Sequence, residues 1–326
     1  PRTRLMLFKL LSSGYLVEID GCLSTGKEAN VYYAKGQNGQ EYAVKIFKTS
    51  ILVFKDRDKY VSGEYRFANG YCKSNPRKMV RVWAEKEMRN LKRMHNANIP
   101  CPEPFQLKSH ILIMQFLGDN GWCAPRLRDV ELTIDQLIEC YSTIVIDMRR
   151  MYHECNLVHG DLSEYNLLWH NNRAVIIDVL ASEFLRKDCA NVTDFFRKKC
   201  FNVLSTYRLY QFVTKPSKEL LTFDASKLSV DASGSVTWLP AIEELRDELL
   251  LMLQTYTQNE EDEEEGNLEE KHEFGIKSAS SAGLSNSVSK DRQKATGDME
   301  DSIFFQTYIP TNLNELVNMP HVELEK

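Results

Sequence analysis

Apolar and polar positions alternate along residues 15–48, which is the pattern of strands with one buried face. A polar turn at residues 36–39, GQNG, separates the runs VYYA and EYAVKIF, so two antiparallel strands are the simplest interpretation. The period then becomes helical over residues 77–95. Two more strand-like runs end in HILIMQFL, before the Gly- and Pro-containing passage GDNGWCAP. This passage marks the predicted crossing from a sheet-rich part to a helical part.

The second half of the chain is predicted to be mainly helical around one hairpin. Residues 133–156 place Leu137, Tyr141, Ile144, Val145 and Met148 on one stripe. The run LLWHNNRAVIID predicts a hairpin that turns at its Asn-Asn dipeptide, and helical patterns return over residues 184–213 and 241–256. From about residue 259 the sequence is acidic and then Ser/Gly-rich through residue 302, which predicts disorder.

Both ends of the chain carry short apolar segments. The start, PRTRLMLFKLLSSG, imitates a signal peptide, but Lys9 interrupts its apolar stretch, so an amphipathic helix is favoured. Because the chain begins without Met, further residues are expected ahead of Pro1. Near the other end, YIPTNLNELVNM at residues 308–319 is interpreted as a segment that docks back onto the body.

Composition excludes collagen-like, fibrous and wholly disordered classes, since 43% of the 326 residues are apolar and 27% are charged. The net charge of −5 is uneven: residues 256–326 hold 16 acidic and 6 basic side chains, which leaves residues 1–255 at +5. A mildly basic body suits a phosphate-handling or RNA-associated protein. No apolar run approaches the ~18 residues of a membrane span. The eight cysteines lack a CxxC pair, which indicates neither a zinc site nor a disulfide scaffold and favours a reducing compartment.

The segment GCLSTGKEA at residues 21–29 matches G-x-x-x-x-G-K as far as Lys27. A phosphate loop of that class needs Ser or Thr next and then a helix, whereas Glu28 and the strand-like NVYYA follow here. A small polar turn between two strands can still cover phosphates with backbone N–H groups. On this segment alone, an ordinary hairpin turn is the favoured interpretation.

Lys45 and Glu87 are charges at positions where apolar residues are expected. Period-two alternation puts Lys45 on the face of Ala43 and Phe47, while Glu87 falls in the apolar helical stripe and Glu85 falls on another face. Burying an unpaired charge is costly, so an ion pair between Lys45 and Glu87 is favoured over an edge-strand lysine that reaches solvent. A strand lysine that faces a helix glutamate orients ATP phosphates in protein kinases.

Asp161 and Asn166 lie in HGDLSEYN, and Asp178 ends the run VIID. In the predicted hairpin, paired residue numbers sum to about 343, which places Asn166 near Ile177 and beside Asp178. Two oxygen ligands at that open end suit Mg²⁺. Asp161 is then available to accept a hydroxyl proton or to orient a nucleophile. His159 has no second His or Cys at ligand spacing, so it is interpreted as a scaffold residue.

The chain resembles the RIO atypical protein kinases, specifically the RIO-one subfamily. The matching segments are STGKEANVY, KTSILVFKDRDKYVSGEYRF, NPRKMVRVWAEKEMRNL, IPCPEP, LVHGDLSEYN and EFLRKDCANV, over about residues 5–215. The resemblance implies an α+β, bilobal, protein-kinase-like fold with a small sheet-rich N-lobe and a larger helical C-lobe. The expected domains are the N-lobe with its family-specific insertion at residues 1–117, the C-lobe at 118–258 and a mostly disordered tail at 259–326.

The resemblance also implies how ATP and Mg²⁺ would be held. Residues 24–29 would cover the phosphates, Lys45 would contact them, and the segment around Met114 would hold adenine. Asp161 would be the catalytic base and Asn166 a metal ligand, while Asp178 would be both a metal ligand and the site of an aspartyl-phosphate intermediate. The residues expected to bind the nucleotide are Ser24, Thr25, Gly26, Lys27, Glu28, Lys45, Glu87, Gln115 and Leu117.

The family acts in late cytoplasmic maturation of the small ribosomal subunit, as a conformational ATPase as much as a protein kinase. The resemblance therefore implies serine/threonine kinase and ATP hydrolase activity, with pre-small-subunit particles of protein and rRNA as partners and with neither DNA nor a membrane. A cytoplasmic location is expected, with shuttling to the nucleus left open.

Two departures from the family pattern leave alternatives open. Gly160 stands where Arg or Ala is usual, and VLAS alone separates Asp178 from the EFLRKDC helix, where the family has a longer stretch. One alternative is a catalytically impaired scaffold that binds nucleotide. The other, from a different class, is an RNA or protein interaction module that binds no nucleotide.

Overall fold

The computed structural model describes residues 2–49, 76–179, 184–199 and 203–215, with short pieces at 229–230, 236–237, 246–247, 249–251 and 301–302. It divides into two compact units, Pro1–Glu131 with Arg150–Leu185, and Leu132–Arg149 with Arg186–Lys326. Each unit combines two separate segments of the chain, so the units do not coincide with the predicted lobes at residues 1–117 and 118–258. The lobe boundaries stay a prediction. Most of the family-specific insertion, the stretch just after Val179, most of the acidic tail and the segment at 308–319 lie outside the described residues.

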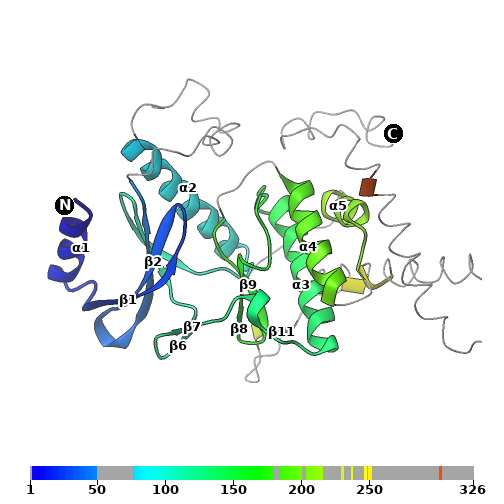
Figure 1. Cartoon of the computed structure of the whole chain (residues 1–326), viewed down its shortest axis with the longest axis horizontal. Helices are drawn as coiled ribbons and strands as arrows, with labels where there is room; N and C mark the ends of the chain where they lie inside the picture. Colours follow the sequence, from blue (N-terminus) through cyan, green and yellow to red (C-terminus); the bar gives the residue numbers. More distant parts are fainter. Residues whose placement is uncertain are drawn as a thin grey trace, which may run out of the picture. The chain divides into compact units, whose positions relative to one another are not determined.

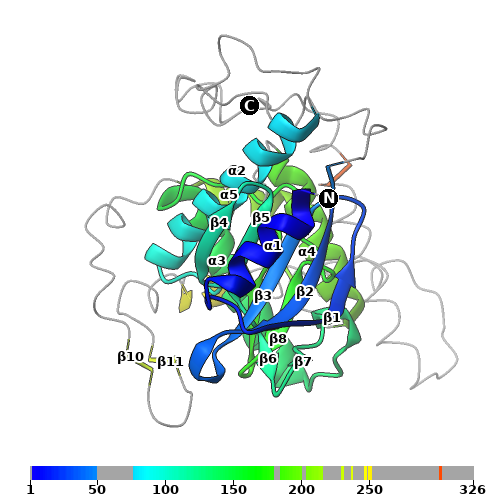
Figure 2. The ribbon, with the colours of Figure 1, turned by 90° about the vertical axis from the view of Figure 1, so that its left-hand side faces the viewer.

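The first unit is built on a five-stranded antiparallel sheet in the order β1-β2-β3-β5-β4 (Figures 1 and 2). Its strands are β1 (Glu18–Thr25), β2 (Ala29–Lys35), β3 (Glu41–Phe47), β4 (Pro104–Lys108) and β5 (Ile111–Gln115). The β2–β3 register runs from Ala29 opposite Phe47 to Lys35 opposite Glu41, which confirms the predicted strand pair. A short 3-10 helix, η1 (Gln37–Gly39), forms the turn between them.

Two helices cover opposite faces of this sheet, as Figures 1 and 2 show from two directions. Helix α1 (Arg2–Ser12), predicted as amphipathic, packs Leu10 into a buried cluster with Leu16, Val44 and Ile113. Helix α2 (Pro76–Asn96) confirms the helix predicted over residues 77–95 and contacts β4 and β5. Because successive side chains of a strand alternate in direction, Val44 faces α1 and the next residue, Lys45, faces α2.

Leu10→Ala is expected to lower the free energy of unfolding by about 2–5 kcal/mol, because it removes a side chain that is 1% exposed from a closed cluster. Leu5 on the same helix is 60% exposed, so Leu5→Ala should change stability by no more than about 0.5 kcal/mol. Urea unfolding of the two variants measures the difference. Equal losses would mean that α1 does not bury the face described here.

Two short hairpins complete the first unit. Strands β6 (Gly118–Asp119) and β7 (Trp122–Cys123) pair within the passage that the sequence predicted only as a crossing. Strands β8 (Leu167–His170) and β9 (Arg173–Ile176) form the predicted hairpin, in a register whose paired numbers sum to 343. Asn171 and Asn172 have φ of 51° and 56°, the positive values that a tight two-residue hairpin turn requires.

The described residues of the second unit are mainly helical, as the sequence predicted for this half of the chain. Helix α3 (Ile134–His153) passes from this unit into the first after Arg149, and helices α4 (Leu185–Lys199) and α5 (Thr206–Thr214) follow. The rings of Tyr141 and Phe196 meet edge to face at 5.2 Å, and the Arg149 guanidinium lies 5.0 Å from the centre of the Phe212 ring. This unit also contains β10 (Ser229–Val230) and β11 (Val236–Thr237), whereas the 3-10 helix η4 (Leu127–Asp129) belongs to the first unit. None of the helices in the described part of the chain is long and apolar enough to cross a membrane.

Candidate active site

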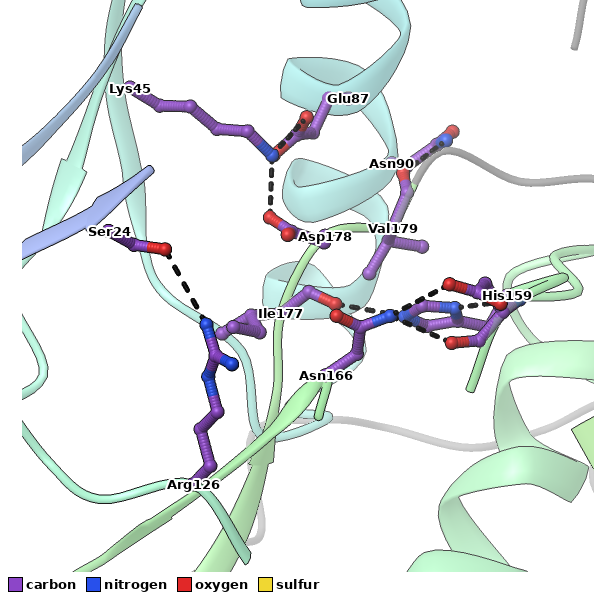
Figure 3. Close-up of polar contacts among 11 residues, drawn as sticks. Ser24, Lys45, Glu87, Asn90, Arg126, His159, Asn166, Ile177, Asp178 and Val179 are labelled. Carbon is purple, nitrogen blue, oxygen red and sulfur yellow. Dashed lines mark hydrogen bonds and ion pairs between the residues drawn. The ribbon is translucent and has the colours of Figure 1, made fainter. Parts of the chain in front are cut away.

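Lys45 is the centre of the candidate site. Strand β3 presents this lysine to α2, where its Nζ donates to the two carboxylate oxygens of Glu87 at 2.7 and 2.8 Å (Figure 3). Lys45 and Glu87 are 5% and 1% exposed, so the predicted ion pair is present and buried. Glu85 lies on another face of α2, as the helical periodicity predicted. There it pairs with Arg81.

The same ammonium also binds Asp178, whose Oδ1 lies 2.5 Å from Lys45 Nζ. Burial by itself would lower the pKa of Lys45, but Asp178 and Glu87 outweigh burial and raise it. Burial raises the pKa of Glu87 against the opposing charge of Lys45. Burial would also raise the pKa of Asp178, but the Lys45 ammonium lowers it below its ordinary value. One positive charge is therefore shared by two carboxylates, and this trio carries a net −1 when both are ionised.

Asp178 follows β9 with a φ of +62°, which is uncommon for a residue with a side chain. Its side chain is 44% exposed, so the carboxylate has room for a ligand beside Lys45. Helix α2 also holds the next residue, since the buried Asn90 donates to the carbonyl of Val179 at 3.0 Å. Sequence reasoning missed both contacts, because each joins residues far apart in the chain without a local pattern.

The loop before β8 brings Asn166 and Asp161 together. Asn166 Nδ2 donates to the main-chain oxygen of Asp161 at 2.8 Å and to its Oδ2 at 3.3 Å. The carbonyl of Asn166 accepts from the N–H of Ile177 at 3.0 Å, so Asn166 lies opposite Ile177 and beside Asp178, as the hairpin register predicted. Since Nδ2 is directed to Asp161, the amide Oδ1 of Asn166 remains for a ligand.

His159 has the scaffold role predicted from the sequence. Its Nδ1 accepts from the N–H of Asp161 at 3.3 Å, and its Nε2 donates to the carbonyl of Ile177 at 2.9 Å. The His159 ring therefore joins the loop to the hairpin. Gly160 has a φ of +82°, a left-handed conformation that glycine adopts without steric cost, which accounts for the departure at this position.

The segment at residues 24–29 is the hairpin end of β1 and β2 with its turn at residues 26–28, and a strand follows it rather than a helix, as the sequence indicated. Gly26 N–H donates to the carbonyl of Ala29 at 2.9 Å, and Lys48 Nζ donates to the carbonyl of Gly26 at 2.6 Å. Burial raises the pKa of Glu28, while the charge of Lys45 opposes the rise. The structure thus brings Glu28 into electrostatic range of the Lys45 trio, while Thr25, Gly26 and Lys27 are exposed.

An apolar cluster lies between the β8–β9 hairpin and residues 117–124. Leu117 packs there with Ala124, Leu168 and Val175, and Ile177 packs against them. Gln115, also predicted near the adenine, uses its side-chain oxygen to accept from the N–H of Glu103 at 3.3 Å. Its side chain is therefore engaged away from a base, and a ligand contact by Gln115 would use its main-chain groups.

The oxygen donors of Asn166 and Asp178 fit a magnesium ion. Asp178 binds Lys45 through one carboxylate oxygen and keeps the other, and Asn166 keeps its amide oxygen. Mg²⁺ is usually bound by one or two such protein oxygens, with water and phosphate oxygens in its other positions. Within the described residues no group of three or more His, Cys, Asp or Glu side chains could hold a metal ion.

Comparison with known proteins identifies the family. A model of the RIO domain matches residues 30–209, more than half of the chain. The chain belongs to the RIO family. It is 57% identical over 226 residues to serine/threonine-protein kinase RIO1 of Homo sapiens, covering 67% of this chain and 40% of that protein. It is 52% identical over 225 residues to serine/threonine-protein kinase rio1 of Schizosaccharomyces pombe, covering 66% and 45%.

These relatives place the chain in the RIO1 subfamily, and the predicted α+β, kinase-like fold class is confirmed. The matched part of the chain spans less than half the length of these two relatives. A crystal structure of a Rio2 kinase-ADP/Mg²⁺-phosphoaspartate complex from Chaetomium thermophilum is 18% identical, with a TM-score of 0.47 over 77% of this chain and 75% of that one.

Proposed function

We propose that the chain is an Mg-ATP-dependent phosphotransferase of the RIO type, an atypical serine/threonine kinase that also hydrolyses ATP. One observation carries the proposal: Lys45 is buried and bridges Glu87 and Asp178, at the end of the hairpin where Asn166 and Asp161 meet. An ammonium, two metal-type oxygen donors and a further carboxylate are the groups that phosphoryl transfer requires. The relatives named serine/threonine-protein kinase support the same conclusion.

Different residues of the site would bind the phosphates, the adenine and the metal ion of Mg-ATP. The turn at residues 24–29 would cover the phosphates with its N–H groups, and the apolar cluster around Leu117 would hold the adenine beside the main chain of Gln115. Lys45, oriented by Glu87, would donate to phosphate oxygens. Asn166 and Asp178 would hold Mg²⁺, which would neutralise phosphate charge when bound.

We infer that Asp178 also acts as a nucleophile. Its half-exposed carboxylate would form a bond to the γ-phosphorus as the bond from that phosphorus to the bridging oxygen of ADP breaks, which releases ADP. Water would then hydrolyse the acyl phosphate to inorganic phosphate and regenerate Asp178. Asp161 is exposed next to Asn166, where it would accept the proton of the attacking water or of a protein hydroxyl.

We further propose that pre-small-subunit ribosomal particles are the partner of this activity, in the cytoplasm. Family membership supports this proposal, and the charge of residues 1–255 has the sign that rRNA phosphates attract. A cycle that ends in hydrolysis suits a protein that drives a release step on such a particle.

Mg-ATP is expected to raise the melting temperature of the full chain, because a ligand that binds the folded state stabilises it by about 2.7 kcal/mol at 100 times its Kd. Adenosine, and ATP with EDTA, are the control ligands, and release of inorganic phosphate is measured in parallel. Stabilisation without hydrolysis would favour the impaired scaffold. The absence of any Mg-ATP effect would contradict the proposal and favour the interaction module.

A further inference from the structure

Arg126 lies beside the candidate site and has no part in the roles assigned above. Its main chain is fixed to the β8–β9 hairpin, because Arg126 forms a β-bridge with Leu168 and Trp169 N–H donates to the carbonyl of Pro125 at 2.8 Å. Its side chain extends from this anchor toward the turn at residues 24–29, where Nη2 lies 3.5 Å from Ser24 Oγ (Figure 3). Arg126 therefore joins the hairpin that carries Asp178 to the turn proposed to cover the phosphates.

The guanidinium of Arg126 is weakly engaged. Its hydrogen bond to the neutral Ser24 hydroxyl is at the long limit for such a bond, and within the described residues no carboxylate lies within ion-pair distance of it. Arg128, two residues on, is different: it donates to the Tyr165 hydroxyl at 3.0 Å and lies 4.9 Å from the centre of that ring. Lys45 is the main cause of the lowered pKa of Asp178 and the positive charge of Arg126 is a smaller one, so the side chains of Arg126 and Asp178 are within electrostatic range.

The charge balance of the site calls for a cation at this position. Lys45 is shared by Glu87 and Asp178, and Glu28 and Asp161 add further carboxylates nearby. A nucleotide triphosphate brings more negative charge to the same place. The Arg126 guanidinium lies beside Ser24 and within electrostatic range of Asp178. A guanidinium fork can bind phosphate oxygens through two N–H groups.

We propose that Arg126 binds the phosphate chain of the nucleotide, exchanging its contact with Ser24 for phosphate oxygens. The inference rests on the proposed function and adds to it a nucleotide-binding residue that lies in the linker after β7, outside the kinase-type motifs. A phosphate chain that runs from beneath residues 24–29 to Asp178 passes the guanidinium. Lys45, Glu87 and Asp178 together carry a net charge of −1, so they supply no net positive charge to the phosphates. Arg126 supplies it.

The experiment compares the full-length wild type with Arg126→Gln, Arg126→Lys and the matched control Arg128→Gln. Binding of Mg-ATP, Mg-ADP and adenosine to each is measured by calorimetry, and melting without nucleotide is recorded for each variant. Arg126→Gln should weaken Mg-ATP binding roughly tenfold or more, the effect of losing a charge-assisted hydrogen bond, with adenosine affinity unchanged. Arg126→Lys should retain part of the affinity, and Arg128→Gln should match the wild type.

The outcomes separate this inference from the proposed function. If the wild type binds Mg-ATP while Arg126→Gln binds it within twofold as well, or loses ATP and adenosine affinity equally, the inference is overturned and the proposed function stands. If the wild type binds no Mg-ATP, both are overturned. A larger loss for Mg-ATP than for Mg-ADP supports contact with the γ-phosphate, and equal losses support contact with the inner phosphates. If Arg126→Gln melts at the wild-type temperature, its loss of Mg-ATP affinity is not caused by a damaged fold.

Discussion

Glu87→Gln is expected to lower the free energy of unfolding by about 3 kcal/mol and to remove most ATP turnover. Both Glu87 carboxylate oxygens accept from Lys45, and neither side chain has access to solvent. Breaking a buried ion pair by removing one partner costs about 3–5 kcal/mol, because the other charge loses its compensation. The lower end is expected here, since Asp178 still accepts from Lys45. Urea unfolding and phosphate release measure the two effects.

Two further variants separate the fold from the chemistry. Glu85→Gln removes the same charge from an exposed face of α2, where Glu85 pairs with Arg81, and should change stability by less than about 1 kcal/mol. The double variant Lys45→Met with Glu87→Leu replaces the buried pair by apolar side chains of similar size, a change that is often neutral. We expect it to recover most of the stability while ATP turnover stays lost.

A stable Glu87→Gln protein with normal turnover would contradict the role of the pair. If Glu85→Gln were as damaging as Glu87→Gln, the wrong face of α2 would have been assigned to the site. A double variant that is stable and still hydrolyses ATP would show that the pair serves packing alone.

The parts of the site that the sequence predicts are those governed by a local period. Alternation along β3 orients Lys45, the helical stripe separates Glu87 from Glu85, and the turn at Asn171 and Asn172 sets the hairpin register. Each pattern is a repeat within one element, and together they were sufficient to predict the Lys45–Glu87 pair and the proximity of Asn166 to Ile177.

The contacts that the sequence did not predict depend on how separate elements meet. Lys45 and Asp178 are 133 positions apart, and Asn90 meets Val179 across 89 positions. Strands β6 and β7 have two residues each, too few to show a period. Arg126 is preceded by a proline in an irregular linker, where no pattern assigns a direction to its side chain. Such contacts follow from the packing of α2 and the hairpin against the sheet.

Asp178→Asn is expected to reduce ATP hydrolysis by at least roughly 100-fold, because it removes the proposed nucleophile and one metal ligand together. The carboxylate is half exposed, and the amide oxygen of Asn can still accept from Lys45, so the melting temperature should change little. Asp119→Asn is the matched control, since Asp119 is an exposed carboxylate of β6 in the same unit. Phosphate release and thermal melting of both variants provide the comparison.

The chemical nature of the phosphorylated product decides between transfer to Asp178 and transfer to a protein hydroxyl. An acyl phosphate on Asp178 would be released by hydroxylamine, and the label from γ-labelled ATP should be absent in Asp178→Asn. Asp161→Asn should slow the formation or the hydrolysis of that label, because Asp161, next to Asn166, is the proposed proton acceptor. Hydroxylamine-resistant phosphoserine, together with normal ATP hydrolysis by Asp178→Asn, would overturn the mechanism. Binding of Mg-ATP without label or hydrolysis would instead favour the impaired scaffold, and would direct attention to the short stretch that follows Asp178.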